Sequence, residues 1–300
     1  MLLNLYKNWS SIRKQIDLLY GMNRRNVELV YAHNPRKYYP FADDKLLCKE
    51  LLVKHDIPVA ETIAVCRGLF EVADTLNFLR DEESFVIKPC NGSGGDGIIV
   101  VGKRKGEGWV TPKNWVSDSE IYQHLANVVF GGFSKQMEDR ALVEKRLIPH
   151  ELFVEFWENG VCDLRIIVLK GVPIMSMVRV PTSRSGGKAN LHQGGIGVAV
   201  ELESGTTFRA ISKGEIVDTH PESGVKMLGR KIPHWDACLD IAIRASKVVP
   251  LDYLGVDIVI DESLGPLILE LNARPGLEIQ NVNLKSLGEA MLEQRVSCET

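Results

Sequence analysis

Three oxygen-bearing side chains near the end of the chain have a spacing that suits a metal ion. The segment 251–275, LDYLGVDIVIDESLGPLILELNARP, is predicted to form two strands around a turn centred at Ser263-Leu264. Asp257 then lies directly opposite Glu270, and Asn272 shares that face of the hairpin. Because two carboxylates are costly to bury among Ile, Leu and Val, a hard cation such as Mg²⁺ is the natural compensation.

The same hairpin has a simpler explanation. On a partly exposed sheet face, Asp257 and Glu270 could pair with lysine or arginine instead of a metal. Asp261 and Glu262 are assigned to the solvated turn. Arg274 follows the second strand, and its guanidinium could hold a phosphoryl or carboxylate group beside the metal.

A second candidate is the glycine cluster KPCNGSGGDGIIVV at residues 88–101. Its glycines can adopt positive φ and turn backbone N–H groups toward an anion, while Lys88 adds a charge and Ser93 a hydroxyl. The residues that follow are β-type, whereas a P-loop or a Rossmann turn opens a helix. Taken alone, the cluster is better explained by a hairpin loop between two strands than by a phosphate site.

Composition limits the classes of protein and partner. The 300 residues are 45% hydrophobic and 25% charged, which is typical of a soluble globular chain. A net charge of -3 from 36 basic and 39 acidic residues gives no broad basic field, so we expect no nucleic-acid partner. No run approaches the roughly 20 apolar residues of a membrane span. The six cysteines form no CxxC pair, which favours reduced thiols, no structural zinc and a cytoplasmic location.

The elements that must position these groups mix helices and strands without a repeat. Residues 1–40 are predicted to be helical and then irregular. Helices are further predicted from Asp43-Asp44 to about His55, over Glu71–Arg80, over Ser117–Phe130 and in HWDACLDIAIRASKVV. Strands are predicted over Val59–Val65 and in FVIK, GIIVVG, ALVEKRL, ELFVEFW, DLRIIVLKG and PIMSMVRV. Short connections predict mostly antiparallel pairing, so the expected fold class is α+β.

Three features in this order resemble the ATP-grasp superfamily: Lys88 with its glycine-rich loop, the strand and hinge ALVEKRL at 141–147, and the acidic hairpin. A closer resemblance is to the alpha-L-glutamate ligase-like proteins related to the ribosomal S6 modification enzyme. It spans about residues 20 to 283 and is carried by GMNRRNVELV, NPRKYYPFADDKLL, IKPCNGSGGDGIIVV, DLRIIVLKG and SGGKANLHQGGIGV.

The resemblance implies an ATP-grasp fold in which two α+β subdomains hold ATP between them, with the glycine loop as a lid. The implied domains are a helical extension at 1–40 in place of a full preceding domain, an N-terminal subdomain with the lid at 41–140, and a C-terminal subdomain with the magnesium site at 141–300. A partner subunit or homo-oligomer could then complete the substrate site.

The resemblance also implies roles for individual residues. The ATP phosphates are contacted by Lys45, Lys88, Gly92, Ser93, Gly94, Gly95 and Gly97. Adenine meets Glu144 and the backbone of Lys145 and Leu147, and Glu151 binds the ribose hydroxyls. Two Mg²⁺ ions, with Mn²⁺ as an alternative, are held by Asp257, Glu270 and Asn272, of which Glu270 bridges.

The family's reaction is carboxylate activation: ATP phosphorylates a carboxylate, and an amine attacks the acyl phosphate to form an amide. Arg165 and Arg274 are the candidates to stabilise the carboxylate and the phosphoryl charge. For Arg165 the alternative is a surface salt bridge to Asp163. The expected substrates are carboxylate and amine small molecules or peptides, for instance glutamate added to a peptide.

The polar, glycine-rich segment 182–197 is expected to line the active site. Asn190 could complete the metal or phosphate shell, and His192 could meet the substrate or serve as a base. Arg179 and Arg184 could recognise an acidic substrate or be surface charge. Two alternative functions stay open: a small-molecule kinase of the same fold, and a non-catalytic ATP-binding module, against which the intact metal triad argues.

Overall fold

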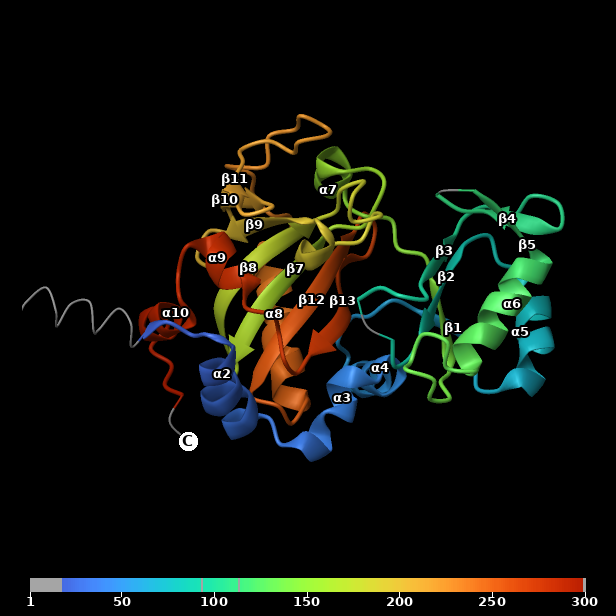
Figure 1. Cartoon of the computed structure of the whole chain (residues 1–300), viewed down its shortest axis with the longest axis horizontal. Helices are drawn as coiled ribbons and strands as arrows, with labels where there is room; N and C mark the ends of the chain where they lie inside the picture. Colours follow the sequence, from blue (N-terminus) through green and yellow to red (C-terminus); the bar gives the residue numbers. More distant parts are fainter. Residues whose placement is uncertain (1–17, 93, 113, 299–300) are drawn as a thin grey trace, which may run out of the picture.

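A computed structural model describes residues 18–92, 94–112 and 114–298, which form a larger and a smaller unit side by side (Figure 1). The larger unit is built on a seven-stranded sheet with the order β11-β10-β9-β8-β7-β12-β13. The smaller unit has a four-stranded sheet, β1-β6-β2-β3, and a hairpin, β4-β5. Neighbouring strands in all three sheets are antiparallel, and with the helices this confirms the α+β class.

The bounds of the elements are as follows. The large sheet contains β7 (Asp163–Leu169), β8 (Val172–Val180), β9 (Ile196–Val200), β10 (Thr207–Ser212), β11 (Glu215–Ile216), β12 (Tyr253–Asp261) and β13 (Gly265–Asn272). The smaller unit contains β1 (Thr62–Cys66), β2 (Phe85–Pro89), β3 (Ile99–Val101), β4 (Gly108–Val110), β5 (Trp115–Ser117) and β6 (Ala141–Lys145). The helices are α2 (Met22–Arg25), η1 (Asn26–Tyr31), η2 (Arg36–Tyr38), α3 (Pro40–Asp43), α4 (Lys45–Lys54), η3 (Leu69–Glu71), α5 (Val72–Leu79), α6 (Asp118–Val129), α7 (Glu151–Phe156), η4 (Leu191–Gln193), α8 (Trp235–Val248), α9 (Glu278–Asn283) and α10 (Leu287–Glu293).

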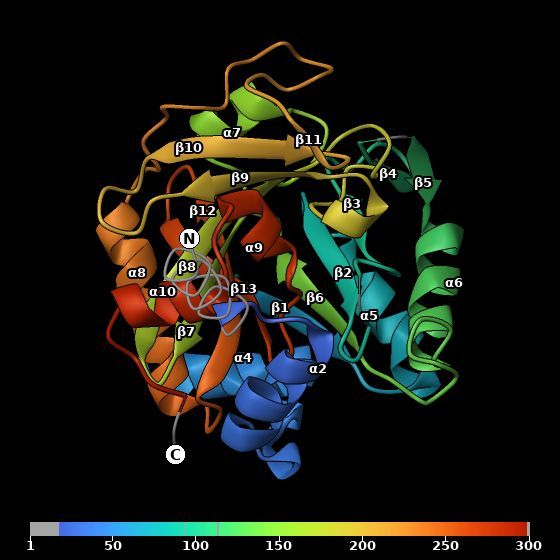
Figure 2. The same cartoon turned by 60° about the vertical axis from the view of Figure 1, so that its left-hand side comes forward.

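The large sheet is covered on both faces. Alternate residues of a strand point to opposite sides, so Leu164 and Ile166 of β7 join a core with α4, α7 and α8. Ile167 and Leu169 point the other way and pack with η1, α9 and α10. Figure 2 shows α9 over the strands of this second face. At the end of that face nearest the smaller unit, charged residues of β7, β8 and β12 replace the apolar ones.

The small sheet buries one face and turns the other toward the larger unit. Phe85 and Ile87 of β2 pack with Val143 of β6 against α5 and α6. The alternation therefore places Lys88 and Glu144 on the opposite face, toward α4.

The described part of the N-terminal segment is fixed to the acidic hairpin. Asn34 Nδ2 donates to the carbonyl oxygens of Tyr253 and Ala273, both at 2.7 Å, and the N–H of Tyr253 donates to Asn34 Oδ1 at 3.0 Å. Arg25 Nη1 donates to the Pro275 carbonyl at 3.0 Å. These contacts hold the end of the hairpin in place. The start of the helix predicted within 1–40 lies outside the described residues.

Several predicted helices are confirmed, with their caps. Asp44 caps α4, its Oδ1 accepting from the N–H groups of Leu46 and Leu47, and Ser117 forms a capping box with Glu120 on α6. The helix predicted in HWDACLDIAIRASKVV is α8. No helix in the described ranges is long and apolar enough to cross a bilayer.

The strand predicted in ELFVEFW is wrong, because this segment is the helix α7. His150 Nδ1 accepts from the Leu152 N–H at 3.2 Å and caps the helix. Leu152, Phe153 and Phe156 then lie on one helical face and enter the core of the large sheet. This packing outweighs the β propensity of the sequence.

Candidate functional site

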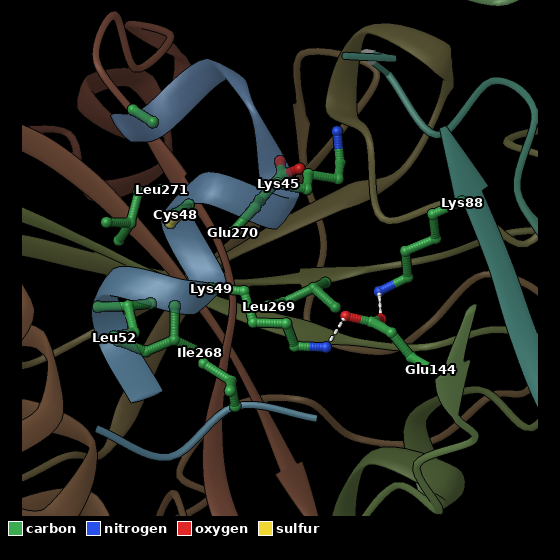
Figure 3. A pocket seen from close by; sticks show the side chains of 12 residues that line it. Lys45, Cys48, Lys49, Leu52, Lys88, Glu144, Ile268, Leu269, Glu270 and Leu271 are labelled. Atoms are coloured by element: carbon green, nitrogen blue, oxygen red, sulfur yellow. Dashed lines mark hydrogen bonds and ion pairs between the residues drawn. The ribbon is translucent and has the colours of Figure 1, made fainter. Parts of the chain in front are cut away.

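A pocket lies where α4, the small sheet and the hairpin β12–β13 meet (Figure 3). Its charged lining consists of Lys45 and Lys49 from α4, Lys88 from β2, Glu144 from β6 and Glu270 from β13. The structure thus brings four predicted site residues together from segments far apart in the sequence. The fifth, Lys49, is not predicted from the sequence.

Lys45 and Lys49 project from the same side of α4. They are four residues apart, which places side chains on one face of a helix, and that spacing was the signal that could have identified Lys49. Lys45 Nζ donates to the carbonyl oxygen of Gly92 at 2.5 Å, so it lies at the start of the glycine loop.

Glu144 is held by two lysines. Lys49 pairs with its Oε1 and Lys88 with its Oε2, and all three residues are less than 10% exposed (Figure 3). Burial would raise the pKa of Glu144, but the two ammonium groups outweigh it and lower that pKa. Burial lowers the pKa of Lys49, and the nearby Glu144 carboxylate offsets only part of this decrease. Two cations facing one anion leave the pocket with positive charge available for an anionic ligand.

A network of buried charges lies beside the pocket on the large sheet. Asp257 is 0% exposed, and Arg165 donates to it from Nε at 2.7 Å and from Nη2 at 2.6 Å. Arg179 donates to Asp257 at 2.7 Å and to both oxygens of Asp163 at 2.5 and 2.6 Å. The strand register explains these pairs, because Asp257 faces Arg165 and Asp163 faces Arg179 across neighbouring strands.

This network shows that two of the alternatives considered for Arg165 and Arg179 are wrong. The salt bridge suggested between Arg165 and Asp163 is wrong, since Arg179 pairs with Asp163 and Arg165 pairs with Asp257. Arg179 is not surface charge, because its side chain is only 13% exposed. Burial would raise the pKa of Asp257, yet Arg165 and Arg179 lower it to about 2, so this carboxylate is ionised at neutral pH.

The predicted pairing in the acidic hairpin is confirmed, since Asp257 lies opposite Glu270. The turn itself differs, because Asp261 pairs with Gly265 and the turn centres one half-residue earlier than expected. An irregularity in the register after Asp257 compensates for that difference. Asn272 also approaches the group, its Nδ2 donating to Asp257 at 3.1 Å.

The donors fit a magnesium ion that is shared with a phosphate ligand. Asp257 and Glu270 lie opposite each other on β12 and β13, and Glu270 borders the pocket. Within the described ranges, no three His, Cys, Asp or Glu side chains form a metal site by themselves. Mg²⁺ is commonly held by one or two carboxylates plus phosphates, so this donor set is adequate. Asn272 must turn its amide oxygen inward to join them.

The assignment of Asp261 to the solvated turn is wrong. Asp261 is buried, and its carboxylate accepts from the N–H groups of Ile148 at 2.7 Å, Ser263 at 2.9 Å and Leu264 at 3.0 Å. It therefore ties the segment after the hinge to the tip of the hairpin. Glu262 is exposed, as predicted.

The glycine loop is anchored at both ends on the smaller unit. At its start, Asp139 accepts from Asn91 Nδ2 at 2.8 Å and from the Asn91 N–H at 3.0 Å. At its end, His124 Nε2 donates to the Gly97 carbonyl at 2.9 Å. Gly97 has φ +74° and lies against the ring of Phe133. The position of the loop is therefore set by α6 and the segment that follows it.

On the phosphate-binding role that the resemblance implies for the glycine loop, Gly97→Ala is expected to reduce kcat/KM for ATP about tenfold, because an added Cβ lies 2.5 Å from Phe133 Cγ in a strained backbone conformation. Steady-state ADP release measures the effect. Gly106→Ala is the matched control, because Gly106 has φ +62° but nothing within 4 Å of the added Cβ. Equal losses in both variants would show that backbone strain, and not contact with Phe133, is responsible.

The tip of the glycine loop meets the polar segment of the larger unit. Lys188 Nζ pairs with Asp96 at 2.6 Å, and its aliphatic chain lies beside Gly95. In the same segment Asn190 Oδ1 accepts from the N–H of His192 at 3.0 Å, and the His192 ring is exposed. The predicted loop residue Ser93 lies outside the described residues.

Four further predicted residues do not line the pocket. Lys145 is exposed and its N–H donates to the Glu61 carbonyl at 2.9 Å, so this donor is already used. Arg274 is exposed, pairs with Asp43 at 2.7 Å and lies over the Tyr39 ring. The other two are Leu147, which is half-buried, and Glu151, which is the exposed first residue of α7.

Comparisons with known proteins identify relatives of this chain. Two relatives described as "Probable alpha-L-glutamate ligase" come from Parasynechococcus marenigrum, 24% identical over 252 residues, and Haemophilus influenzae, 27% identical over 249 residues. These matches cover 84% and 83% of this chain, but only 40% and 61% of the relatives.

A solved structure supports the fold. The complex of biotin carboxylase with β,γ-ATP from Campylobacter jejuni superposes with a TM-score of 0.54 at 12% identity, over 88% of this chain and 48% of that one. The family model described as "Sugar-transfer associated ATP-grasp" matches residues 24–295. This match spans most of the chain, so the protein belongs to the sugar-transfer associated ATP-grasp family and has the ATP-grasp fold.

Proposed function

We propose that this chain is an ATP-dependent carboxylate–amine ligase. The observation that carries the proposal is the convergence of Lys45 and Lys88 in a pocket bordered by Glu270, which faces Asp257. A cluster of ammonium groups next to paired carboxylates suits a triphosphate and its divalent cation. The family membership and the named relatives support ATP as the nucleotide.

The proposed roles follow from position. Lys45, Lys88 and the backbone of the loop 94–97 bind the phosphates. On the family resemblance, and not on position, the backbone of the segment 144–147 contacts adenine, and Glu151 contacts the ribose. Asp257, Glu270 and Asn272 hold Mg²⁺, which when bound neutralises charge on the phosphates.

Arg165 does not reach the pocket directly. Its guanidinium is committed to both oxygens of Asp257, so we propose that it fixes the orientation of this carboxylate. Arg274 is paired with Asp43, and a contact with the carboxylate substrate requires that exposed pair to open. Asn190 and His192, in the loop that meets the glycine loop, are proposed to face the second substrate.

The proposed reaction transfers the γ-phosphoryl group of ATP to a carboxylate, giving ADP and an acyl phosphate. An amine then attacks the carbonyl carbon, the C–O bond to phosphate breaks, and an amide and free phosphate leave. Positioning and charge neutralisation are sufficient for such steps, and no protein nucleophile is needed. The names of the relatives support an amino acid such as glutamate as one substrate.

One observation favours a second candidate. The family description refers to sugar transfer, and a kinase acting on a sugar or polyol hydroxyl would use the same ATP and Mg²⁺ groups. Such a kinase releases ADP and a phosphorylated product without free phosphate.

A substrate screen tests both functions. Amino acids, short peptides, amines, sugars and polyols are supplied with MgATP, and ADP and free phosphate are measured in parallel. We expect ADP and phosphate in equal amounts that depend on both a carboxylate and an amine. ADP without phosphate, with a sugar or polyol as acceptor, would replace the ligase proposal with the kinase.

The thiols support a reducing compartment. All six cysteines lie in the described ranges and are unpaired, five of them buried. We therefore propose a cytoplasmic location. We also propose that a partner subunit or a second copy of the chain completes the substrate site.

A further inference from the structure

We propose that Lys49 is a positioning residue that keeps Glu144 paired, so that Lys88 is free to bind the nucleotide phosphates. The inference rests on the proposed function, because it takes Lys88 to be a phosphate ligand. Lys49 would then set the affinity for the nucleotide through a neighbour.

The geometry gives each oxygen of Glu144 its own lysine. Lys49 reaches Oε1 from α4, whereas Lys88 reaches Oε2 from β2 (Figure 3). Lys88 can therefore turn toward a ligand without disturbing the contact at Oε1.

Burial makes this second partner necessary. Glu144 is 5% exposed, and a buried carboxylate that loses its cations is strongly disfavoured. When Lys88 moves to a phosphate, Lys49 remains within ion-pair distance and Glu144 stays neutralised. No other lysine or arginine in the described ranges lies within ion-pair distance of Glu144.

Without Lys49, the nucleotide and Glu144 would compete for Lys88. Glu144 would have Lys88 as its single cationic partner, and the nucleotide would have to compete with a buried carboxylate for that ammonium group. Binding would weaken even though no nucleotide contact had been removed. Replacing Glu144 by glutamine should remove the competition, and this predicted coupling separates positioning from direct contact.

The test is a double-mutant cycle on the full chain. The dissociation constant of MgATP is measured by titration calorimetry for wild type, Lys49→Met, Glu144→Gln and the double variant. We expect Lys49→Met to weaken binding about tenfold in the wild-type background and to have almost no effect in the Glu144→Gln background. ADP release should show the loss in KM more than in kcat.

Two controls keep the result interpretable. Lys54→Met removes an exposed lysine from the end of the same helix and should leave binding unchanged. Lys49→Arg keeps the charge and should keep most of the affinity, which also covers the case in which Lys49→Met unfolds. Thermal melting reports the folded fraction of each variant.

The outcomes are distinct. A tenfold loss that persists in the Glu144→Gln background would overturn the inference and make Lys49 a direct nucleotide contact. Wild-type affinity in Lys49→Met, together with a loss in Lys88→Met, would overturn the inference alone. Absence of MgATP binding to the wild-type chain would overturn the proposed function as well.

Discussion

Lys88→Met and Glu270→Gln are each expected to lower ATP turnover about 10³-fold while the fold persists, because each removes a charge that the proposed function assigns to the phosphates or their metal. The substitution Lys88→Met leaves the buried Glu144 still paired with Lys49, so little stability should be lost. Glu270 is only half-buried and borders the pocket. ADP release over a range of Mg²⁺ concentrations, at saturating nucleotide, measures the loss, and circular dichroism checks the fold.

Matched controls exist for both changes. Lys54→Met and Glu262→Gln alter exposed residues of the same types, on α4 and at the tip of the same hairpin, and should keep full activity. Near-normal ADP release by Lys88→Met or Glu270→Gln would overturn the assignment of this pocket as the nucleotide site. A loss that excess Mg²⁺ partly reverses in Glu270→Gln, and not in Lys88→Met, would identify Glu270 as the metal ligand.

The sequence predicted those features of the site that depend on a local pattern of residues. Alternation along the two final strands predicted that Asp257 and Glu270 face each other, and the N-cap Asp44 predicted where the helix carrying Lys45 begins. Both depend on short-range geometry. The resemblance to ATP-grasp proteins implied that Lys88 and Glu144 both contact ATP, and in the structure both residues line one pocket.

What the sequence could not supply is the choice of partners between distant segments. Arg179 and Asp163 lie 16 residues apart on different strands, and only the register of β7 with β8 reveals their pairing. Asp261 was assigned to the turn because its main partner, the N–H group of Ile148, belongs to a segment 113 residues earlier in the chain. The strand predicted at ELFVEFW failed for the same reason, because the core of the large sheet selects a helix there.

Arg165→Met is expected to lower the free energy of unfolding by about 3 kcal/mol, because it breaks a buried ion pair and leaves Asp257 incompletely neutralised. Arg179 would then serve two carboxylates, those of Asp257 and Asp163, with one guanidinium. Urea unfolding followed by circular dichroism measures the change. Arg80→Met is the control: its pair with Asp118 is on the surface, and it should cost less than about 1 kcal/mol.

Neutralising Asp257 tests the cause of that loss. If an uncompensated carboxylate is responsible, Asp257→Asn in the Arg165→Met background should recover part of the stability. ATP turnover should not recover with it, because the double variant has also lost a carboxylate facing Glu270. Recovery of both stability and turnover would mean that Asp257 serves the sheet and not the metal. Equal stability of Arg165→Met and Arg80→Met would instead show that Arg179 alone suffices to hold the buried charges.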